Sequence, residues 1–304
     1  MDAVAPTIKR LIAEHKARRE HWYFHEFVPW EQGRNYVDEP WDKSQATLRP
    51  EVRTALLLNL LTEDNLPYYY GQLATTYGET PVMADWRGLW TAEEGQHAIA
   101  MRSYLLVSRN VDPRILEDDR MTTVTRGWDN ADNGIQDPLD LFVYTATQEL
   151  ATRLSHFNSG QQADDEIAYE LMKRIASDEN HHFLFYSGVV TEMLNHMPSE
   201  VLIAMAKVNQ AFAMPGTTMP QWTRRSLEVA KAGIYNHRVH AEKVLTPLLR
   251  IWKLDQITDL TPEAEQARDY MMALPDEYIA MAESFEARLA KRASKRAKKP
   301  VAVG

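Results

Sequence analysis

The chain contains 304 residues, of which 44% are hydrophobic and 25% are charged, as is typical of a folded globular protein. Cysteine is absent, which excludes disulfides, cysteine-bound iron–sulfur clusters and thiolate zinc sites, so His, Asp and Glu must hold any metal. No stretch approaches the roughly 20 consecutive apolar residues of a membrane span, and no apolar signal core follows the N-terminus. We therefore expect a cytoplasmic protein without a membrane span.

The net charge of −9 is unevenly distributed along the chain. Without the seven basic residues near the C-terminus the rest of the chain carries −16; they are Arg288, Lys291, Arg292, Lys295, Arg296, Lys298 and Lys299. Because an acidic body repels nucleic acid, we expect no such partner. A disordered, solvated tail over residues 288–304 is the favoured interpretation of the basic segment, and a nucleic-acid or membrane contact is the alternative.

Residues 1–48 form a separate N-terminal part in this interpretation. Within it, residues 7–20 predict a short basic helix. Residues 22–41 are rich in aromatic side chains and are interrupted by proline and glycine, which predicts an irregular arm.

A long helical domain is predicted over residues 49–287. Its first helix begins near Pro50, and Pro67 predicts a kink within it because proline lacks the N–H that the helix needs. The polar segment 114–137 is predicted to be a connection with at most a short helix. No segment shows the alternation of a β-strand, which indicates an all-α protein. Further helices are predicted at about 83–109, 139–160, 164–195, 199–213, 220–252 and 262–295.

Two similar tetrads interrupt long apolar stripes. They are Glu94-Gly-Gln-His97 and Glu179-Asn-His-His182, and each places a carboxylate and an imidazole three residues apart on one helix face. A third acid precedes each tetrad: Glu63 lies 31 residues before Glu94, and Glu149 lies 30 residues before Glu179. A helical hairpin of this length returns the chain to the same level, so each acid is expected to face its tetrad.

The two halves together supply four carboxylates and two imidazoles from four antiparallel helices. This is the ligand set of di-iron carboxylate bundles, and its oxygen and nitrogen donors suit two iron ions, with manganese as an alternative. Glu and His residues on helices are commonly solvated and without a special role. That interpretation does not explain why six of them interrupt apolar stripes, where burying an unpaired charge is costly. We therefore expect the six residues Glu63, Glu94, His97, Glu149, Glu179 and His182 to be metal ligands.

Neighbouring polar residues are candidates for supporting roles. Glu93 and Asp178 each precede a ligand histidine by four residues and could fix the imidazole tautomer, with ordinary surface acids as the alternative. His156 is expected to support the site or to be a core histidine rather than a ligand, and His181 lies off the inward stripe. Thr152 could offer a hydroxyl near bound oxygen, and plain packing is an equal alternative.

The motifs resemble those of a known family. Four stretches are similar in order and spacing to the metal-site motifs of the soluble acyl-acyl-carrier-protein desaturases of plants and actinobacteria; they are Leu61–Pro67, Trp90–His97, Gln148–His156 and Ser177–His182. The similarity extends from the aromatic arm to beyond residue 250. The resemblance implies a homodimeric, ferritin-like bundle whose di-iron centre uses O2 and two electrons to remove two hydrogens from an acyl chain on acyl carrier protein.

The resemblance also implies residue roles. By this resemblance the six acids and histidines named above are the iron ligands. Thr152 would lie near the oxygen site, and Asp178 would contact a metal ligand rather than a metal. Trp30 weakly aligns with a tryptophan on the family's electron route. Two departures from the plant pattern, Gly95 and Phe183, remove no ligand. Since the chain holds no cysteine, electrons must come from a separate donor, plausibly a ferredoxin. A basic segment is the candidate docking site for the acidic carrier, with Lys9, Arg10, Lys16, Arg18 and Arg19.

Other reactions use the same kind of site. A di-iron oxygenase that hydroxylates or N-oxygenates a carrier-bound substrate is the nearest alternative, because the outcome depends on how the substrate is placed relative to the activated oxygen. Iron storage with ferroxidase activity is less favoured, since such chains are about half as long. The all-glutamate carboxylate set disfavours a ribonucleotide reductase radical subunit. Acyl chain length and double-bond position stay open.

Overall fold

The computed structural model describes residues 2–78, 80–127 and 134–297, and every regular element in these ranges is a helix. The all-α prediction is thus confirmed for the described part of the chain. None of its helices combines the length and the apolar character needed to cross a membrane.

Proline marks the first residue of most long helices. Its fixed φ suits the helix start, and its missing N–H is not needed there because the first N–H groups of a helix have no internal partner. The helices that begin in this way are α2 (Pro50–Asp64), α4 (Pro81–Val107), α5 (Pro113–Arg126), α6 (Pro138–Gln161), α8 (Pro198–Gln210) and α12 (Pro262–Ala297). The longest helix of the core, α7 (Glu166–His196), begins instead with Asp165, whose carboxylate accepts a hydrogen bond from the N–H of Ala168 at 2.7 Å.

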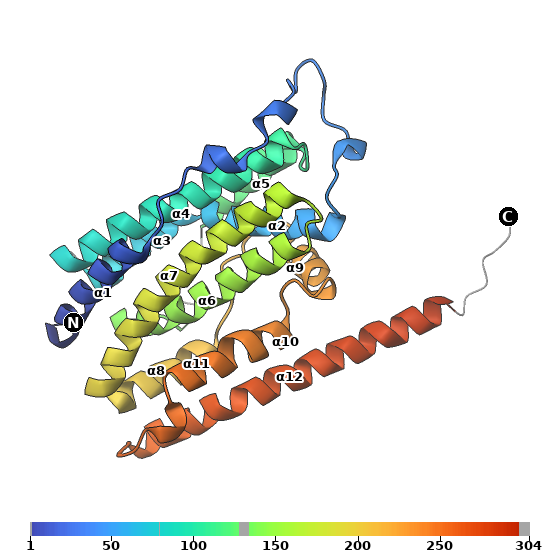
Figure 1. Cartoon of the computed structure of the whole chain (residues 1–304). Helices are drawn as coiled ribbons and strands as arrows, with labels where there is room; N and C mark the ends of the chain where they lie inside the picture. The colour runs from blue at the N-terminus through green and yellow to red at the C-terminus, as the bar shows by residue number, and fades with distance from the viewer. Residues whose placement is uncertain (1, 79, 128–133, 298–304) are drawn as a thin grey trace.

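Helices α2, α4, α6 and α7 form the central bundle (Figure 1). Helices α6 and α7 are the most extensively packed pair and form an antiparallel hairpin. Gly160 permits their close approach near the turn, because a Cβ at this position would lie only 2.8 Å from the Cβ of Met172. The bundle buries the predicted apolar stripes and brings the polar residues that interrupt them toward a common interior.

The N-terminal part follows the prediction. Helix α1 (Ala5–Arg18) packs on α7 and α4, and the segment after it forms only short 3₁₀ turns, the first at Phe24–Phe27. The arm lies against the bundle, with the Trp22 side chain buried.

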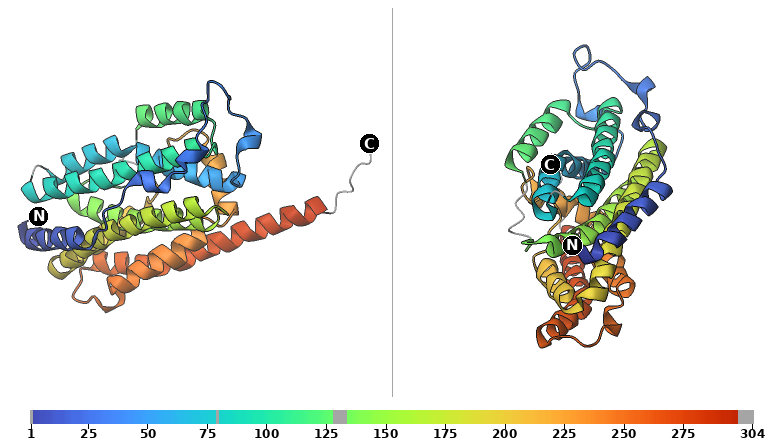
Figure 2. Two further views of the ribbon diagram at one scale, coloured as in Figure 1. Left: turned by 45° about the horizontal axis from the view of Figure 1, so that its top comes forward. Right: turned by 90° about the vertical axis from the view of Figure 1, so that its left-hand side faces the viewer.

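A second group of helices covers the bundle beside α6 and α7. It consists of α8, α10 (His237–His240), a π-helical turn (Ala241–Leu245), α11 (Thr246–Ile251) and α12, whereas α9 (Trp222–Lys231) packs on α2. Helix α12 packs along α8 and then projects beyond the bundle (Figure 2). The basic segment therefore begins inside a helix rather than in the disordered tail expected from residue 288, and residues 298–304 lie outside the described residues.

Two predicted boundaries are wrong. The segment 114–137 contains the helix α5, whose polar surface hides its role: it buries Leu116 and joins Asp119 to Arg225 of α9 by an ion pair at 2.6 Å. The single helix predicted over 220–252 is broken after α9, where Gly233 adopts a positive φ of 74°.

The break near Pro67 is confirmed. Helix α2 ends at Asp64, and a new helix, α3 (Leu66–Tyr77), begins with Pro67 in its first turn. The first helix thus ends one residue after Glu63.

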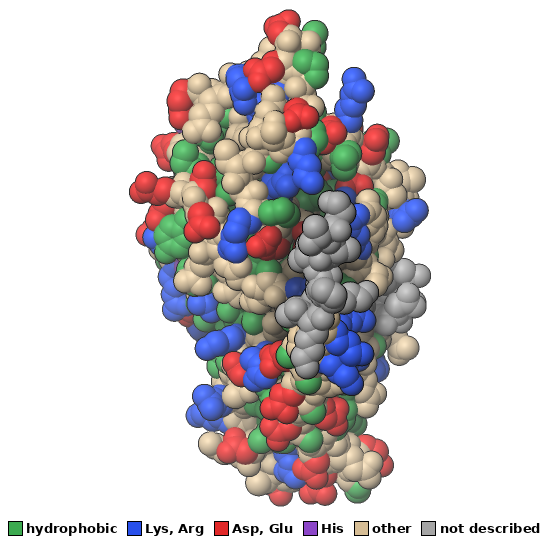
Figure 3. All heavy atoms as spheres, turned by 90° about the vertical axis from the view of Figure 1, so that its right-hand side faces the viewer, with side chains coloured by type: hydrophobic (Ala, Val, Ile, Leu, Met, Phe, Trp, Pro, Cys, Tyr) green, Lys and Arg blue, Asp and Glu red, His purple; other side chains and the backbone are tan. Residues whose placement is uncertain are grey.

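The end of the molecule toward which α12 projects shows a mixed surface. Acidic and basic side chains are interspersed over this face, and neither sign forms one continuous area (Figure 3).

Candidate metal centre

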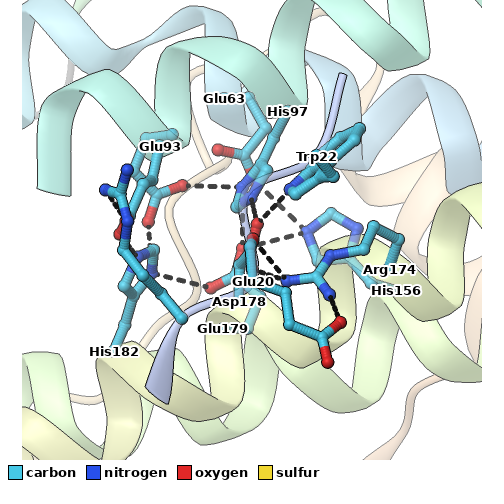
Figure 4. Close-up of polar contacts among 12 residues, drawn as sticks. Glu20, Trp22, Glu63, Glu93, His97, His156, Arg174, Asp178, Glu179 and His182 are labelled. Atoms are coloured by element: carbon cyan, nitrogen blue, oxygen red, sulfur yellow. Dashed lines mark hydrogen bonds and ion pairs between the residues drawn. The ribbon is translucent and has the colours of Figure 1, made fainter. Parts of the chain in front are cut away.

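The structure brings all six predicted ligand residues together inside the bundle. Helix α2 supplies Glu63, α4 supplies Glu94 and His97, α6 supplies Glu149, and α7 supplies Glu179 and His182. All six are at least 95% buried. Two overlapping groups have potential ligand atoms within 4.8 Å of one another: Glu63, Glu94, His97 and Glu179 form one, and Glu94, Glu149, Glu179 and His182 form the other. Figure 4 shows the side chains of this region converging from opposite helices.

Glu94 and Glu179 lie between the two histidines. The Nδ1 atom of His97 is 3.2 Å from Glu94 Oε2 and 3.3 Å from Glu179 Oε1. The Nδ1 atom of His182 is 3.0 Å from Glu94 Oε1 and 3.5 Å from Glu149 Oε2. Glu94 and Glu179 can therefore each contribute to both groups, whereas Glu63 and Glu149 each belong to one.

Hydrogen bonding within the protein leaves key atoms of this cluster unsatisfied. Both oxygens of Glu179, Oε2 of Glu149 and Nδ1 of His182 are buried and make no well-aligned hydrogen bond, although they lie within ion-pair distance of neighbouring side chains. Such atoms are costly to bury unless something compensates them. Carboxylate oxygens and imidazole nitrogens aimed at a common interior are suited to metal ions such as iron or manganese, so the residues present fit a two-metal centre.

Electrostatics within the cluster points the same way. Burial raises the pKa of Glu63 and of Glu149 well above the usual range, and neighbouring carboxylates reinforce this. Burial also opposes the charge of Glu94, but the adjacent His182 and His97 outweigh it and hold the Glu94 pKa well below the usual value. Four carboxylates in this space cannot all be ionised without added positive charge.

Asp178 and Glu93 contact the outer nitrogens of the two histidines. Asp178 Oδ2 lies 3.3 Å from Nε2 of His97, and Glu93 Oε2 lies 3.0 Å from Nε2 of His182. Because these contacts occupy Nε2, they hold the rings with Nδ1 toward the carboxylates. The geometry matches the supporting roles expected for both acids.

Four further residues anchor these acids and were missed by sequence reasoning. The indole Nε1 of Trp22 donates to Asp178 Oδ2 at 2.7 Å, and Arg174 forms an ion pair with the same carboxylate. On the other side, His15 lies 2.9 Å and Arg19 2.7 Å from Glu93. Three of the four lie in the N-terminal part. This part is far from the motifs along the chain, so no sequence pattern indicates that it contacts them.

Trp30, which weakly aligned with a family tryptophan, does not reach this site. Its side chain is 51% exposed, and its indole donates to the backbone oxygen of His25. Trp22 lies beside Asp178 and His97 instead, and the alignment of Trp30 stays a prediction.

His156 and the two threonines also take definite positions. His156 is fully buried, its Nε2 lies 3.2 Å from Glu63 Oε1, and burial lowers its pKa to about 4. Thr152 donates to the backbone oxygen of Gln148 at 2.9 Å, and Thr62 donates to that of Leu58 at 3.0 Å. Both threonines line a cavity beside the cluster.

That cavity begins at three of the carboxylates and follows α3 and α6. Its wall includes Glu63, Glu94 and Glu179 on the metal side. Beyond them the lining side chains are Tyr69, Gln72, Leu73, Trp90, Leu141, Tyr144, Thr145 and Gln148. A substrate placed here would lie directly beside the metal ligands.

Comparison with known proteins identifies the family of the chain. The family model described as fatty acid desaturase matches residues 1–302. The chain belongs to this family. DesA1 of Mycobacterium tuberculosis, named as an acyl-[acyl-carrier-protein] desaturase, is 33% identical over 289 residues, which cover 92% of this chain and 86% of DesA1. The chloroplastic stearoyl-[acyl-carrier-protein] 9-desaturase of Ricinus communis is 30% identical over 238 residues, covering 72% of this chain and 59% of that desaturase.

A solved structure of the family has the same fold. The X-ray structure of the acyl-ACP desaturase DesA2 from Mycobacterium tuberculosis superposes with a TM-score of 0.71 at 27% sequence identity, covering 87% of this chain and 97% of that chain.

Proposed function

We propose that this desaturase introduces a double bond into an acyl chain carried on acyl carrier protein. The observation that carries the proposal is the buried pair of Glu and His groups, which share Glu94 and Glu179 and open onto a cavity, in a chain of the desaturase family. Relatives named as acyl-[acyl-carrier-protein] desaturases support the carrier-bound substrate.

The metal ligands in this proposal are the six residues of the centre. Glu63 and His97 would hold one ion, Glu149 and His182 the other, and Glu94 and Glu179 would serve both. Two iron ions bound there would supply the chemistry that activates O2 with two electrons.

The chain's own residues orient this centre. Asp178 and Glu93 fix the tautomers of His97 and His182, and the anchors Trp22 and His15 hold the two acids in place. Thr152 lies on the cavity wall, where we propose that its hydroxyl stands near the oxygen site. The buried bundle excludes water from the reacting carbons.

Partners complete the proposal. Since the chain has no cysteine, we propose a separate ferredoxin-type electron donor, and we propose a homodimer in the cytoplasm. Ion pairs neutralise several basic side chains of the candidate docking segment on α1, which makes it a weaker candidate for binding the acidic carrier. Lys16 pairs with Asp85, Arg19 with Glu93, and Arg10 with Glu14. The projecting end of α12 is a second basic candidate, because among the described residues Arg288, Lys291, Arg292 and Lys295 form no ion pair.

The test is reconstitution with iron, ferredoxin, its reductase, NADPH, O2 and acyl carrier proteins bearing a range of acyl chains. Mass spectrometry showing the loss of two hydrogens from the acyl chain, together with about two irons per chain, supports the proposal. Gain of one oxygen would identify an oxygenase on the same site. Bound iron without any change in the acyl chains, combined with assembly into large cages by light scattering, would identify storage.

A further inference from the structure

A middle cavity lies next to the cavity that borders the metal ligands. It has a volume of about 250 Å³, and α2, α6 and α9 line it with the buried side chains of Leu58, Ser155 and Val229. Thr62 and Pro215 line both cavities. The hydroxyl of Thr62 lies 3.2 Å from the backbone oxygen of Pro215, so the two cavities meet at this contact. The space beside the metal ligands is therefore continued toward α9.

An outer cavity extends this row to the surface. It has a volume of about 480 Å³ and lies between α9, α10 and α12. Met214, Ser226 and Tyr235 line both this cavity and the middle one. Leu227 and His237 of its wall are exposed, so the outer cavity opens to solvent. Three neighbouring cavities thus lead from the carboxylates of the centre to the surface between α9 and α12.

The outer cavity is suited to an acyl chain. Its wall includes the rings of Tyr278 and Phe285 and the side chain of Met214. Methylene groups gain free energy when they leave water for such a wall, and the volume is usual for a ligand site. The Tyr235 hydroxyl lies 2.8 Å from Nδ1 of His240, which holds this ring, whereas Met214 is unbranched and adapts to its neighbours. Movement of Met214 is therefore the smallest change that would join the outer and middle cavities.

Helix α12 continues the wall of the outer cavity as a basic stripe. Tyr278 and Phe285 lie seven residues apart on one face, and Leu289 and Arg292 follow on the same face. Arg288 lies three residues after Phe285, one turn further along the helix. Neither arginine forms an ion pair within the described part of the chain, and both belong to the part of α12 that projects past the bundle (Figure 1). Two cations without an acidic partner therefore adjoin the opening of the outer cavity.

We propose that the acyl chain enters through the outer cavity, and that acyl carrier protein docks on the adjoining face of α12 with its acidic surface against Arg288 and Arg292. This inference rests on the proposed desaturase function and deepens it, because it assigns one docking surface and one route to the metals. Complementary charge guides and orients such an encounter. Among the described residues, none of α1 lines any of the three cavities, so a carrier docked on α1 would lack this route.

The docking surface is tested with acyl carrier protein that bears no acyl chain. Fluorescence anisotropy of the labelled carrier measures its binding to the iron-loaded enzyme. Arg288→Glu combined with Arg292→Glu is expected to weaken this binding about 10-fold and to raise KM for acyl-loaded carrier by a similar factor, with kcat unchanged. Arg250→Glu combined with Lys253→Glu is the matched control. It changes the net charge equally at the end of α11, away from the projecting end of α12, and should bind carrier like the wild type (Figure 1).

The route is tested by narrowing the wall that the outer and middle cavities share. Ser226→Phe places a ring there and is expected to lower kcat/KM for acyl-loaded carrier about 10-fold or more, while the carrier without an acyl chain binds as to the wild type. Thr191→Phe adds the same ring at an exposed position of α7 and should turn over substrate like the wild type. Iron content and melting temperature show whether Ser226→Phe folds. If it does not, Met214→Trp narrows the same wall from the segment before α9.

The outcomes separate this inference from the proposed function. Carrier binding and KM at wild-type levels in the double arginine variant would overturn docking on α12. Wild-type turnover by the iron-loaded Ser226→Phe variant would overturn the route. A dimer that dissociates in the double arginine variant, seen by light scattering, would assign this face to a second copy of the chain and overturn the carrier as its partner. Failure of the wild type to remove two hydrogens from any acyl chain would instead overturn the proposed function and this inference with it.

Discussion

Replacing Glu149 by glutamine should stabilise the metal-free protein and weaken its response to metal. Glu149 is fully buried; one oxygen accepts from Trp90 Nε1 at 3.0 Å, and the other lies 3.5 Å from His182 Nδ1 without a well-aligned hydrogen bond. Glutamine has the same shape and keeps an oxygen for Trp90, but it carries no charge. Because burial raises the pKa of Glu149 well above its usual value, the folded chain keeps this carboxyl protonated near neutral pH whereas the unfolded chain ionises it; removing this cost is worth about 2 kcal/mol, which raises the melting temperature of a chain of this size by roughly 4 °C.

The metal-loaded protein should show the opposite order. Metal present at about 100 times its dissociation constant stabilises a protein by roughly 2.7 kcal/mol, and loss of one ligand removes much of this gain in Glu149→Gln. Differential scanning calorimetry with chelator and with ferrous iron measures both effects. Glu277→Gln, at an exposed site on α12, is the control and should follow the wild type in both conditions. A Glu149→Gln variant that melts lower than wild type without metal, or gains as much from metal, would refute the reasoning.

Three further predictions concern other parts of the structure. Trp22→Phe removes the bond to Asp178 and is expected to weaken iron binding about 10-fold, as measured by competition with a chelator. The pKa of His240 is lowered to about 3 by burial, while that of an unfolded histidine is about 6.5, so only the unfolded chain takes up this proton between these values. Stability should therefore fall as the pH drops from 7.5 to 5, by about 2 kcal/mol more in wild type than in His240→Phe in urea unfolding. Reversing the charges of Arg288 and Lys291 is expected to raise KM for carrier-bound substrate several-fold in steady-state assays, because the carrier is acidic.

Each of these predictions has an internal control. Trp30→Phe changes an exposed tryptophan far from the metal centre and should bind iron like the wild type, so equal losses in both tryptophan variants would contradict the role given to Trp22. If the free energy of unfolding of wild type and of His240→Phe changed equally with pH, His240 would not be the cause of the pH dependence. Charge reversal of Lys9 and Arg10 on α1 tests the other docking surface, and an effect confined to that pair would assign docking to α1.

Helix geometry alone is enough to predict that the six acids and histidines of the centre come together. A helix has a fixed rise and period, so a Glu and a His three residues apart must share a face, and a second helix returning after about 30 residues must pass the same level. These regularities are local, and the bundle preserved them for Glu63, Glu94, His97, Glu149, Glu179 and His182. The same local rules correctly placed the break at Pro67 and the irregular aromatic arm.

The residues that surround the centre depend on contacts between segments far apart in the chain. Trp22 and Asp178 are separated by 156 positions, and His15 and Glu93 by 78, so no periodicity connects them. The polar helix α5 and the break after α9 were not predicted, because their sequences carry only weak local patterns. Contacts between these segments, such as the ion pair of Asp119 with Arg225, stabilise them instead. The sharing of Glu94 and Glu179 between two groups likewise depends on how four helices pack, since the period of a helix does not determine the angle at which it meets another.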